Sequence, residues 1–356
     1  PVIANDGHDE LESAGLGGDL VWGSYGLDQC LDLAQDALAR GNGVAAPVGS
    51  TWRVGEGMAL GMIATMAPRG HIAEVEVTVG ADGVYELGVG TAEFGNGTTT
   101  VHTQIAATDL ATGADRIRLR SSDTDGAPYD TGAFASAGIT VAGRALHAAC
   151  ESLREVLVDA AVRTVVSLRE GDRRVSRSIS ADASSELGDL LLGSEGDAVL
   201  ERDGVRVGDR LITFAELLPA VPAEHRRGDR VIATGEERGD RRSLAFNVQA
   251  FRVAVDVETG AVRILQSIQS ADAGRVLNPE QCRGQIEGGV AQGIGSALYE
   301  EVLIGDDGAV VNPVFRQYRV PQMADIPVTE VSFANTSDSL GPFGAKSMSE
   351  SPFDPV

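Results

Sequence analysis

Alternating apolar and polar residues in the first half of the chain predict a β-hairpin followed by a helix. Residues 71–79 and 84–89 alternate in this way and flank Gly80-Ala-Asp-Gly83, whose glycines suit a tight turn. A loop follows, and Thr98-Thr-Thr then opens a predicted helix through Leu110, because threonine is a fair residue to begin a helix. We therefore expect hairpin, loop and helix in that order.

The same order returns in the second half of the chain. Residues 246–257 and a strand through Ser270 flank a turn at 258–260, and a helical pattern over 281–301 follows a second loop. The repetition predicts an α+β protein with two lobes, each built from a β-hairpin, a loop and a helix.

Further apolar patterns predict elements outside the repeated units. Residues 28–40 have helical spacing, residues 116–121 are typical of a strand, and an apolar strand is expected from Gly57. Residues 134–165 predict a long helix with one apolar stripe. That stripe consists of Val141, Ala145, Ala149, Leu153 and Leu157.

These patterns divide the chain of 356 residues into four expected segments. Residues 1–50 form a partial N-terminal helical or linker segment, and residues 51–170 form the first lobe. Residues 171–245 are charged and rich in glycine, which indicates a connector with short strands. Residues 246–356 form the second lobe.

The charge excludes some partners. The chain has 52 acidic and 29 basic residues and a formal net charge of −23, which repels nucleic acid and anionic membranes.

No apolar run is long enough to span a membrane, and no secretion signal is seen. Cys30, Cys150 and Cys282 have neither disulfide nor metal-ligand spacing, so we expect a reducing, cytoplasmic location and no protein metal ligands. Because the chain begins at Pro1, we expect a fragment.

Lys346 is the single lysine among 29 lysine and arginine residues, and it lies in Gly341-Pro-Phe-Gly-Ala-Lys-Ser-Met-Ser-Glu350. A lysine kept where arginine is otherwise used indicates a place where a planar guanidinium would not serve. Its ammonium could bind an anion, and Glu350 could take up a proton. Compositional bias is the alternative explanation.

Three loops, at 93–97, 130–136 and 341–350, are rich in glycine and small polar residues. Backbone N–H groups in such loops, at helix N-termini, favour phosphate or another anion.

The helix at 281–301 also carries five glycines, which forgo about 4–5 kcal/mol of helix propensity. Either its bare faces admit a large ligand, with Gln285 and Gln292 as amide partners, or the glycines allow close packing; the spacing leaves both open.

Five motifs in order resemble the molybdopterin-binding large subunit of the xanthine dehydrogenase and aldehyde oxidase family of molybdenum hydroxylases. The resemblance covers about residues 51–356, the later part of such a subunit. Its motifs are Glu93-Phe-Gly-Asn-Gly-Thr-Thr-Thr, Pro128-Tyr-Asp-Thr-Gly-Ala-Phe-Ala-Ser136, the stretch from Asp272 to Gly293, Tyr318-Arg-Val-Pro-Gln-Met-Ala-Asp-Ile-Pro327, and Gly341 to Glu350.

The resemblance implies hydroxylation of an aldehyde or an N-heterocycle with water as the oxygen source, and electrons passed to iron–sulfur and FAD-binding partner subunits. The implied cofactor is molybdopterin, with or without a cytosine dinucleotide tail, whose dithiolene holds the metal. Glu350 would be the general base. The residues implied to surround the cofactor are Gly95, Asn96, Gly97, Gly132, Ala133, Phe134, Ala135, Ser136, Gln285, Lys346, Ser347, Met348 and Ser349.

Within this resemblance we expect the Lys346 ammonium to point away from Glu350 and toward the cofactor anion. Ser347 and Ser349 depart from the glycines that many relatives carry, which changes backbone freedom at those two positions. The alternative to an enzyme is a lobe of the same scaffold without activity, which serves structure or partner binding.

Overall fold

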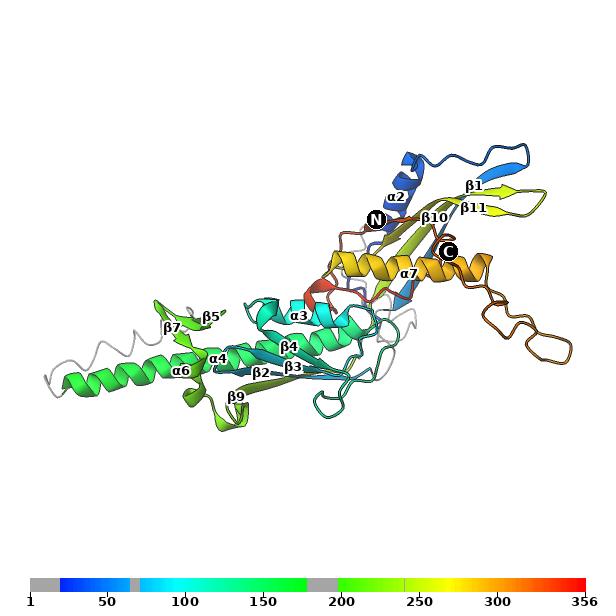
Figure 1. Cartoon of the computed structure of the whole chain (residues 1–356). Coiled ribbons are helices and arrows are strands. Elements are labelled where there is room, and N and C mark those ends of the chain that lie inside the picture. The colour runs from blue at the N-terminus through cyan, green and yellow to red at the C-terminus, as the bar shows by residue number, and fades with distance from the viewer. Residues whose placement is uncertain (1–19, 65–70, 178–197, 240) are drawn as a thin grey trace. The chain divides into compact units, whose positions relative to one another are not determined.

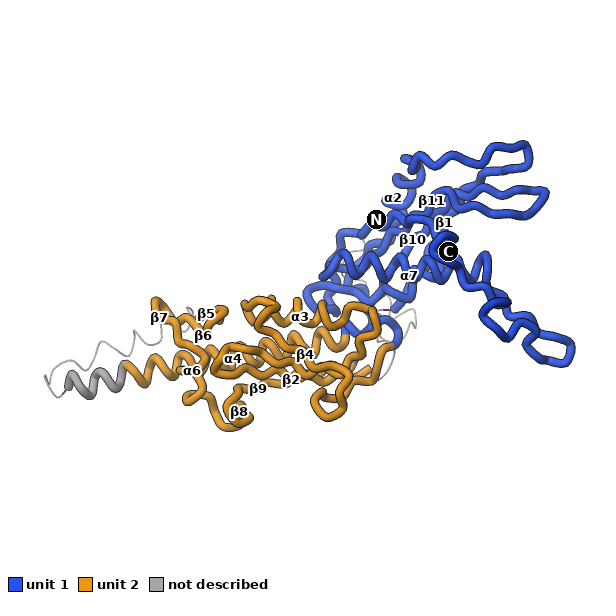
Figure 2. Tube along the Cα trace, viewed as in Figure 1, with its two compact units in different colours: residues 1–69, 134–140, 239–356 blue, residues 70–133, 141–238 orange. Residues whose placement is uncertain are grey.

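The computed structural model describes residues 20–64, 71–177, 198–239 and 241–356. The chain divides into two compact units (Figure 2). Unit 1 comprises residues 1–69, 134–140 and 239–356, and unit 2 comprises residues 70–133 and 141–238. Each unit contains its own β-sheet, so each is described by itself.

Unit 1 is built on a sheet of four strands (Figure 1), in the order β1 (Trp52–Ala64), β10 (Leu244–Asp256), β11 (Val262–Ala271) and β12 (Thr329–Phe333). The first three strands are antiparallel neighbours, and β12 runs parallel to β11. The strand β1 is therefore joined by hydrogen bonds to a strand almost 200 residues later in the chain.

One helix covers each face of this sheet (Figure 1). Helix α2 (Leu27–Arg40) buries Cys30, Ala34 and Ala37 against Val248 and Ile268. Helix α7 (Pro279–Leu298) packs on the other face, where its buried side chains meet the ends of β10 and β11. The residues of this second core include Ala245, Ala271, Ile286, Val290 and Ile294.

Unit 2 is built on a sheet of five strands, in which β4 runs parallel to β3 and the other neighbours are antiparallel. Their order is β4 (Ile117–Ser121), β3 (Tyr85–Val89), β2 (Ala73–Gly80), β9 (Arg230–Glu237) and β8 (Arg226–Arg227).

Two helices accompany this sheet, α3 (Thr98–Asp109) and α4 (Gly138–Arg177). All five residues of the predicted apolar stripe of α4 are fully buried. Helix α4 lies close to β9, because a Cβ placed on Gly235 would stand 2.1 Å from the carbonyl oxygen of Ala145. Glycine at this position allows helix and strand to touch.

The remaining elements of unit 2 are small. A sheet of three antiparallel strands contains β5 (Ala198–Glu201), β6 (Gly204–Val207) and β7 (Arg210–Thr213), and α6 (Phe214–Leu217) follows it. The short 3₁₀ helices are η1 (Ala114–Arg116), η3 (Leu218–Ala220), η4 (Ala223–His225) and, in unit 1, η5 (Pro342–Gly344). Among the described helices, none is long and apolar enough to cross a membrane.

The structure confirms the α+β class and both predicted units of hairpin, loop and helix, but the division of the chain differs from the expected lobes. The strand β1 was expected in the first lobe and pairs with β10 of the second. The strand β9 was expected in a connector and lies between β2 and β8. Alternation along a strand shows which side chains share a face, but it does not show which strand is the neighbour.

Candidate active site

Glu350 lies at the tip of a turn in unit 1 and is exposed. The N–H of Ser351 donates to the carbonyl of Met348 at 3.1 Å, and the N–H of Phe353 donates to the carbonyl of Glu350 at 3.3 Å. Met348, two residues before Glu350, is 5% exposed, and Ser351, directly after it, is 0% exposed. The turn thus exposes the Glu350 carboxylate to solvent, while Met348 and Ser351 are packed inside the protein.

Two glycines of α7 hold the chain that follows Glu350. A Cβ on Gly289 would stand 3.0 Å from the Cβ of Pro352, and a Cβ on Gly293 would stand 2.6 Å from the Cβ of Val356. These two glycines therefore let the last residues lie directly against the helix. Close packing, one of the two explanations that the sequence left open, applies to this face of α7.

The other explanation, that bare faces of the helix admit a large ligand, fits a second face of α7. A Cβ on Gly284 or Gly288 would meet no atom within 4 Å, so this face is open among the described residues. Gln281 and Gln285 lie on the same face by helical spacing. The Oε1 of Gln281 is buried and has no hydrogen-bond partner in the described part of the chain. Sequence reasoning missed Gln281, although its spacing from Gln285 and Gly288 was visible.

The side chain of Lys346 is fully buried and makes three hydrogen bonds inside unit 1. Its Nζ donates to the carbonyl of Leu244 at 2.7 Å, to Oδ2 of Asp272 at 2.7 Å and to the carbonyl of Ser24 at 3.2 Å. All three N–H bonds of an ammonium are used in this way. In this structure the ammonium thus faces acceptors of unit 1, and its expected contact with a cofactor anion stays a prediction.

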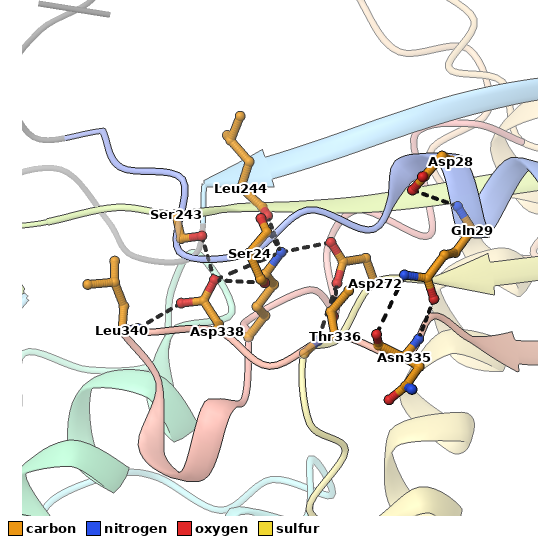
Figure 3. A network of polar contacts seen from close by, with 12 residues as sticks. Ser24, Asp28, Gln29, Ser243, Leu244, Asp272, Asn335, Thr336, Asp338 and Leu340 are labelled. Carbon is orange, nitrogen blue, oxygen red and sulfur yellow. Dashed lines mark hydrogen bonds and ion pairs between the residues drawn. The ribbon is translucent and has the colours of Figure 1, made fainter. Parts of the chain in front are cut away.

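Two buried carboxylates balance the ammonium and are themselves well bonded (Figure 3). Asp272 accepts from Oγ1 of Thr336 at 2.5 Å, and Oδ2 of Asp338 lies 3.9 Å from the lysine Nζ. Asp338 also accepts from Oγ of Ser243 at 2.6 Å and from the N–H of Leu340 at 2.8 Å. Sequence spacing gave no sign that the aspartates at 272 and 338 would meet the lysine.

Ser347 and Met348, which follow Lys346, are buried, and the chain returns to the surface at Glu350. The hydroxyls of Ser347 and Thr140 share a buried hydrogen bond of 2.7 Å. Met348 packs in the core with Ile286 and Val290 of α7, and Ser349 is half-buried. Of the residues expected to contact the cofactor here, Ser349 is the most accessible.

The predicted loop at Gly95, Asn96 and Gly97 belongs to unit 2, where Glu93 occupies its donors. The Glu93 carboxylate accepts from the N–H of Gly95 at 2.7 Å, of Gly97 at 3.2 Å and of Thr99 at 3.0 Å. Desolvation raises the pKa of Glu93, but these hydrogen bonds outweigh it and lower the pKa to about 2. The anion at the start of α3 is thus the chain's own carboxylate, and no threonine side chain caps the helix.

The loop at 130–136 is held through Asp130, which accepts from Oγ1 of Thr91 at 2.9 Å and from the N–H of Gly132 at 2.8 Å. Desolvation opposes ionisation of Asp130, but the hydrogen bond from His71 and these donors lower its pKa overall. Ala135 and Ser136 have φ of 49° and 53°, in the left-handed region.

The predicted cofactor residues are distributed over both units. Gly132 and Ala133 belong to unit 2 with the Gly95 loop, whereas Phe134, Ala135 and Ser136 belong to unit 1 with Gln285 and Glu350. The structure brings together Gln285, on α7, and the residues from Lys346 to Glu350 within one unit. A common site that also includes the loops of unit 2 stays a prediction.

Residues 33–327 match the model of the molybdopterin cofactor-binding domain, so the chain belongs to this family. It is 30% identical, over 326 residues, to a putative xanthine dehydrogenase molybdenum-binding subunit of Escherichia coli K12. That alignment covers 90% of this chain and 39% of the relative. It is also 25% identical, over 282 residues, to the carbon monoxide dehydrogenase large chain of Afipia carboxidovorans, covering 78% of this chain and 32% of that one.

The fold is shared with solved structures of the same kind. Quinoline 2-oxidoreductase from Pseudomonas putida 86 matches with a TM-score of 0.70 and 23% identity, covering 97% of this chain and 40% of that chain. The chain therefore spans between about a third and two fifths of the length of these relatives. At this identity the match shows the fold alone.

Proposed function

We propose that the protein takes part in molybdenum-dependent hydroxylation of an aldehyde or an N-heterocycle, with water as the oxygen source. Membership of the molybdopterin cofactor-binding family supports this reaction class. Two relatives from Escherichia coli K12 are named as molybdenum-binding subunits, one of a putative xanthine dehydrogenase and one of an aldehyde oxidoreductase. The electrons would pass to iron–sulfur and FAD-binding partner subunits.

The observation that carries the proposal is the Glu350 turn. A general base must be accessible to a substrate or a cofactor, and it must be held in position. Glu350 is exposed, whereas Met348 and Ser351 on either side are buried. We assign to Glu350 the removal of a proton from the water-derived oxygen that attacks the substrate.

The open face of α7 supports binding of the pterin. A pterin carries ring N–H and amino groups, and the buried Oε1 of Gln281 is an acceptor without a partner among the described residues. The absence of Cβ atoms at Gly284 and Gly288 leaves room beside it. When bound, the molybdenum cofactor would accept two electrons from the substrate carbon.

Gln285, Gln281, Ser347 and Ser349 are the residues of unit 1 that we propose to hold this cofactor, with Phe134, Ala135 and Ser136 from the loop before α4. Gly95, Asn96, Gly97, Gly132 and Ala133 remain proposed contacts of unit 2. Because Glu93 and Asp130 already accept from Gly95, Gly97 and Gly132, a phosphate there would have to replace a carboxylate of the chain. A cytosine dinucleotide tail and a cytoplasmic location also belong to this proposal.

The test is a Glu350→Gln variant of the complete subunit, produced together with its partner subunits. We expect wild-type molybdenum content and a loss of turnover of about 10²–10⁴-fold, the usual contribution of general acid–base catalysis. Glu258→Gln removes an exposed carboxylate from a hairpin turn of the same unit and should leave both quantities unchanged.

Turnover that survives in Glu350→Gln at wild-type molybdenum content would refute the assigned base. Molybdenum missing from an intact wild-type complex would instead favour the alternative, a lobe of the scaffold without activity.

A further inference from the structure

We infer that Lys346 is a positioning residue, which anchors the loop that carries Glu350 and does not itself bind the cofactor. The inference rests on the proposed function for its catalytic consequence only. The anchor itself is a property of unit 1, because every residue that bonds the ammonium belongs to this unit.

The ammonium joins segments that are far apart in the chain. Ser24 lies before α2, Leu244 begins β10, and Asp272 follows β11. Lys346 itself lies four residues before Glu350. One buried cation therefore ties the Glu350 loop to the N-terminal segment and to two central strands at once.

The backbone around Lys346 is held at the same place. The N–H of Lys346 donates to the carbonyl of Ala273 at 2.9 Å, and the carbonyl of Gly344 accepts from the N–H of Arg275 at 2.7 Å. Gly274 has a φ of 61°, and a Cβ there would stand 2.2 Å from the carbonyl oxygen of Gly344. The loop is thus in direct backbone contact with residues 273–275. The ammonium bonds to Asp272, which directly precedes this segment.

Burial makes the ammonium hard to replace. Asp272 and Asp338 are 0% and 5% exposed, so loss of the cation would leave two buried carboxylates without their positive partner. Removal of one member of a buried ion pair is strongly destabilising, because the remaining charge is left buried without a partner and without hydration. Three acceptors around one nitrogen also suit an ammonium, whereas a planar guanidinium presents five N–H groups that this closed site could not all pair.

The single lysine of the chain is therefore explained by geometry at a buried site. The sequence indicated a place where arginine would not serve, and the structure gives the ammonium partners within the chain. The partners are two aspartates and two carbonyls of the chain.

The first test needs no substitution, because peptide mass spectrometry reads Lys346 separately from every other amine. The complete subunit with its partners is treated with an amine-reactive reagent, and peptide mass spectrometry measures labelling at Lys346. We expect labelling at least 100-fold slower than in denatured protein, at the same rate in molybdenum-loaded complex and in complex produced without molybdenum. Labelling that becomes as fast as in denatured protein when the cofactor is missing would overturn the inference.

The second test compares Lys346→Met and Lys346→Arg in the same complex. We expect faster amide hydrogen exchange at residues 341–349 in both variants, and turnover per bound molybdenum lowered at least 10-fold with little change in KM. Adding Asp272→Asn to Lys346→Met should restore part of the exchange protection, because one of the unpaired charges is removed.

The matched control is Arg283→Met, which removes an exposed cation that pairs with Glu287 on α7. It should change neither exchange at residues 341–349 nor turnover. Wild-type exchange in Lys346→Met, together with lowered molybdenum content, would show that the lysine is a cofactor contact. If molybdenum never binds the wild-type complex, the proposed function fails, while the labelling and exchange results still decide the role of Lys346.

Discussion

At the scale of single residues, the chain's own carboxylates take the positions that an anionic ligand was expected to fill. Glu93 accepts from the donors at the start of α3, and Asp272 accepts from the Lys346 ammonium. Neither arrangement was predicted from the sequence. A protein with a net charge of −23 has many carboxylates that can satisfy its own donors.

Replacement of Glu93 tests the first of these arrangements. Glu93→Gln should lower the stability of unit 2 by about 1 kcal/mol at pH 7, a value at the modest end for a helix cap because the residue is exposed. The pKa of Glu93 is lowered from 4.5 to about 2 in the folded chain. Its contribution is therefore complete above pH 4.5 and is lost as the pH falls toward 2.

The melting temperatures of Glu93→Gln and the wild type, measured between pH 7 and pH 3, check this prediction. The difference between the two proteins should shrink as the pH falls, and a constant difference would contradict it. Glu224→Gln removes another exposed carboxylate from unit 2 and should follow the wild type throughout.

At the scale of elements, α7 combines a packed face and an open face. The two faces predict opposite outcomes for the same substitution. Gly288→Ala should raise stability by up to about 1 kcal/mol, because alanine is the better helix former and its Cβ meets nothing. Gly293→Ala should lower stability, because its Cβ would stand 2.6 Å from Val356.

Thermal unfolding of the two α7 variants separates these outcomes, and a gain in both would show that the last residues do not pack on the helix. Molybdenum content gives a second measurement on Gly288→Ala. A stable variant with lowered molybdenum content is expected if the pterin lies on the open face.

At the scale of the whole molecule, two electrostatic effects compete. Exposed ion pairs such as Arg116–Asp203 and Arg206–Glu201 each contribute little to stability and weaken with salt. The excess of 23 negative charges opposes compactness, and salt reduces that repulsion. We expect the second effect to dominate, because the repulsion involves every carboxylate whereas each pair is weak.

The melting temperature of the chain should therefore rise when NaCl is increased from 0.05 to 0.5 M. An uncharged osmolyte at the same osmolality controls for exclusion from the protein surface. A fall in melting temperature would show that the ion pairs outweigh the net charge.

Local pattern was sufficient for several elements of this protein, although β12 was not predicted. Both hairpins, the helices after them and the buried stripe of α4 follow from the spacing of apolar side chains, because a helix and a strand repeat at different periods along the chain. The Glu350 motif was likewise visible as a contiguous segment. Boundaries were less exact, since α4 begins at Gly138 and not at Phe134.

Only the tertiary structure decided which segments meet. The pairing of β1 with β10, the two aspartates beside Lys346, and the division of the α7 glycines into packed and open positions all join residues distant in the chain. Period and spacing describe a segment and its near neighbours. Partners across the fold are selected by the burial of whole faces and by the pairing of buried charges, which depend on the folded chain as a whole.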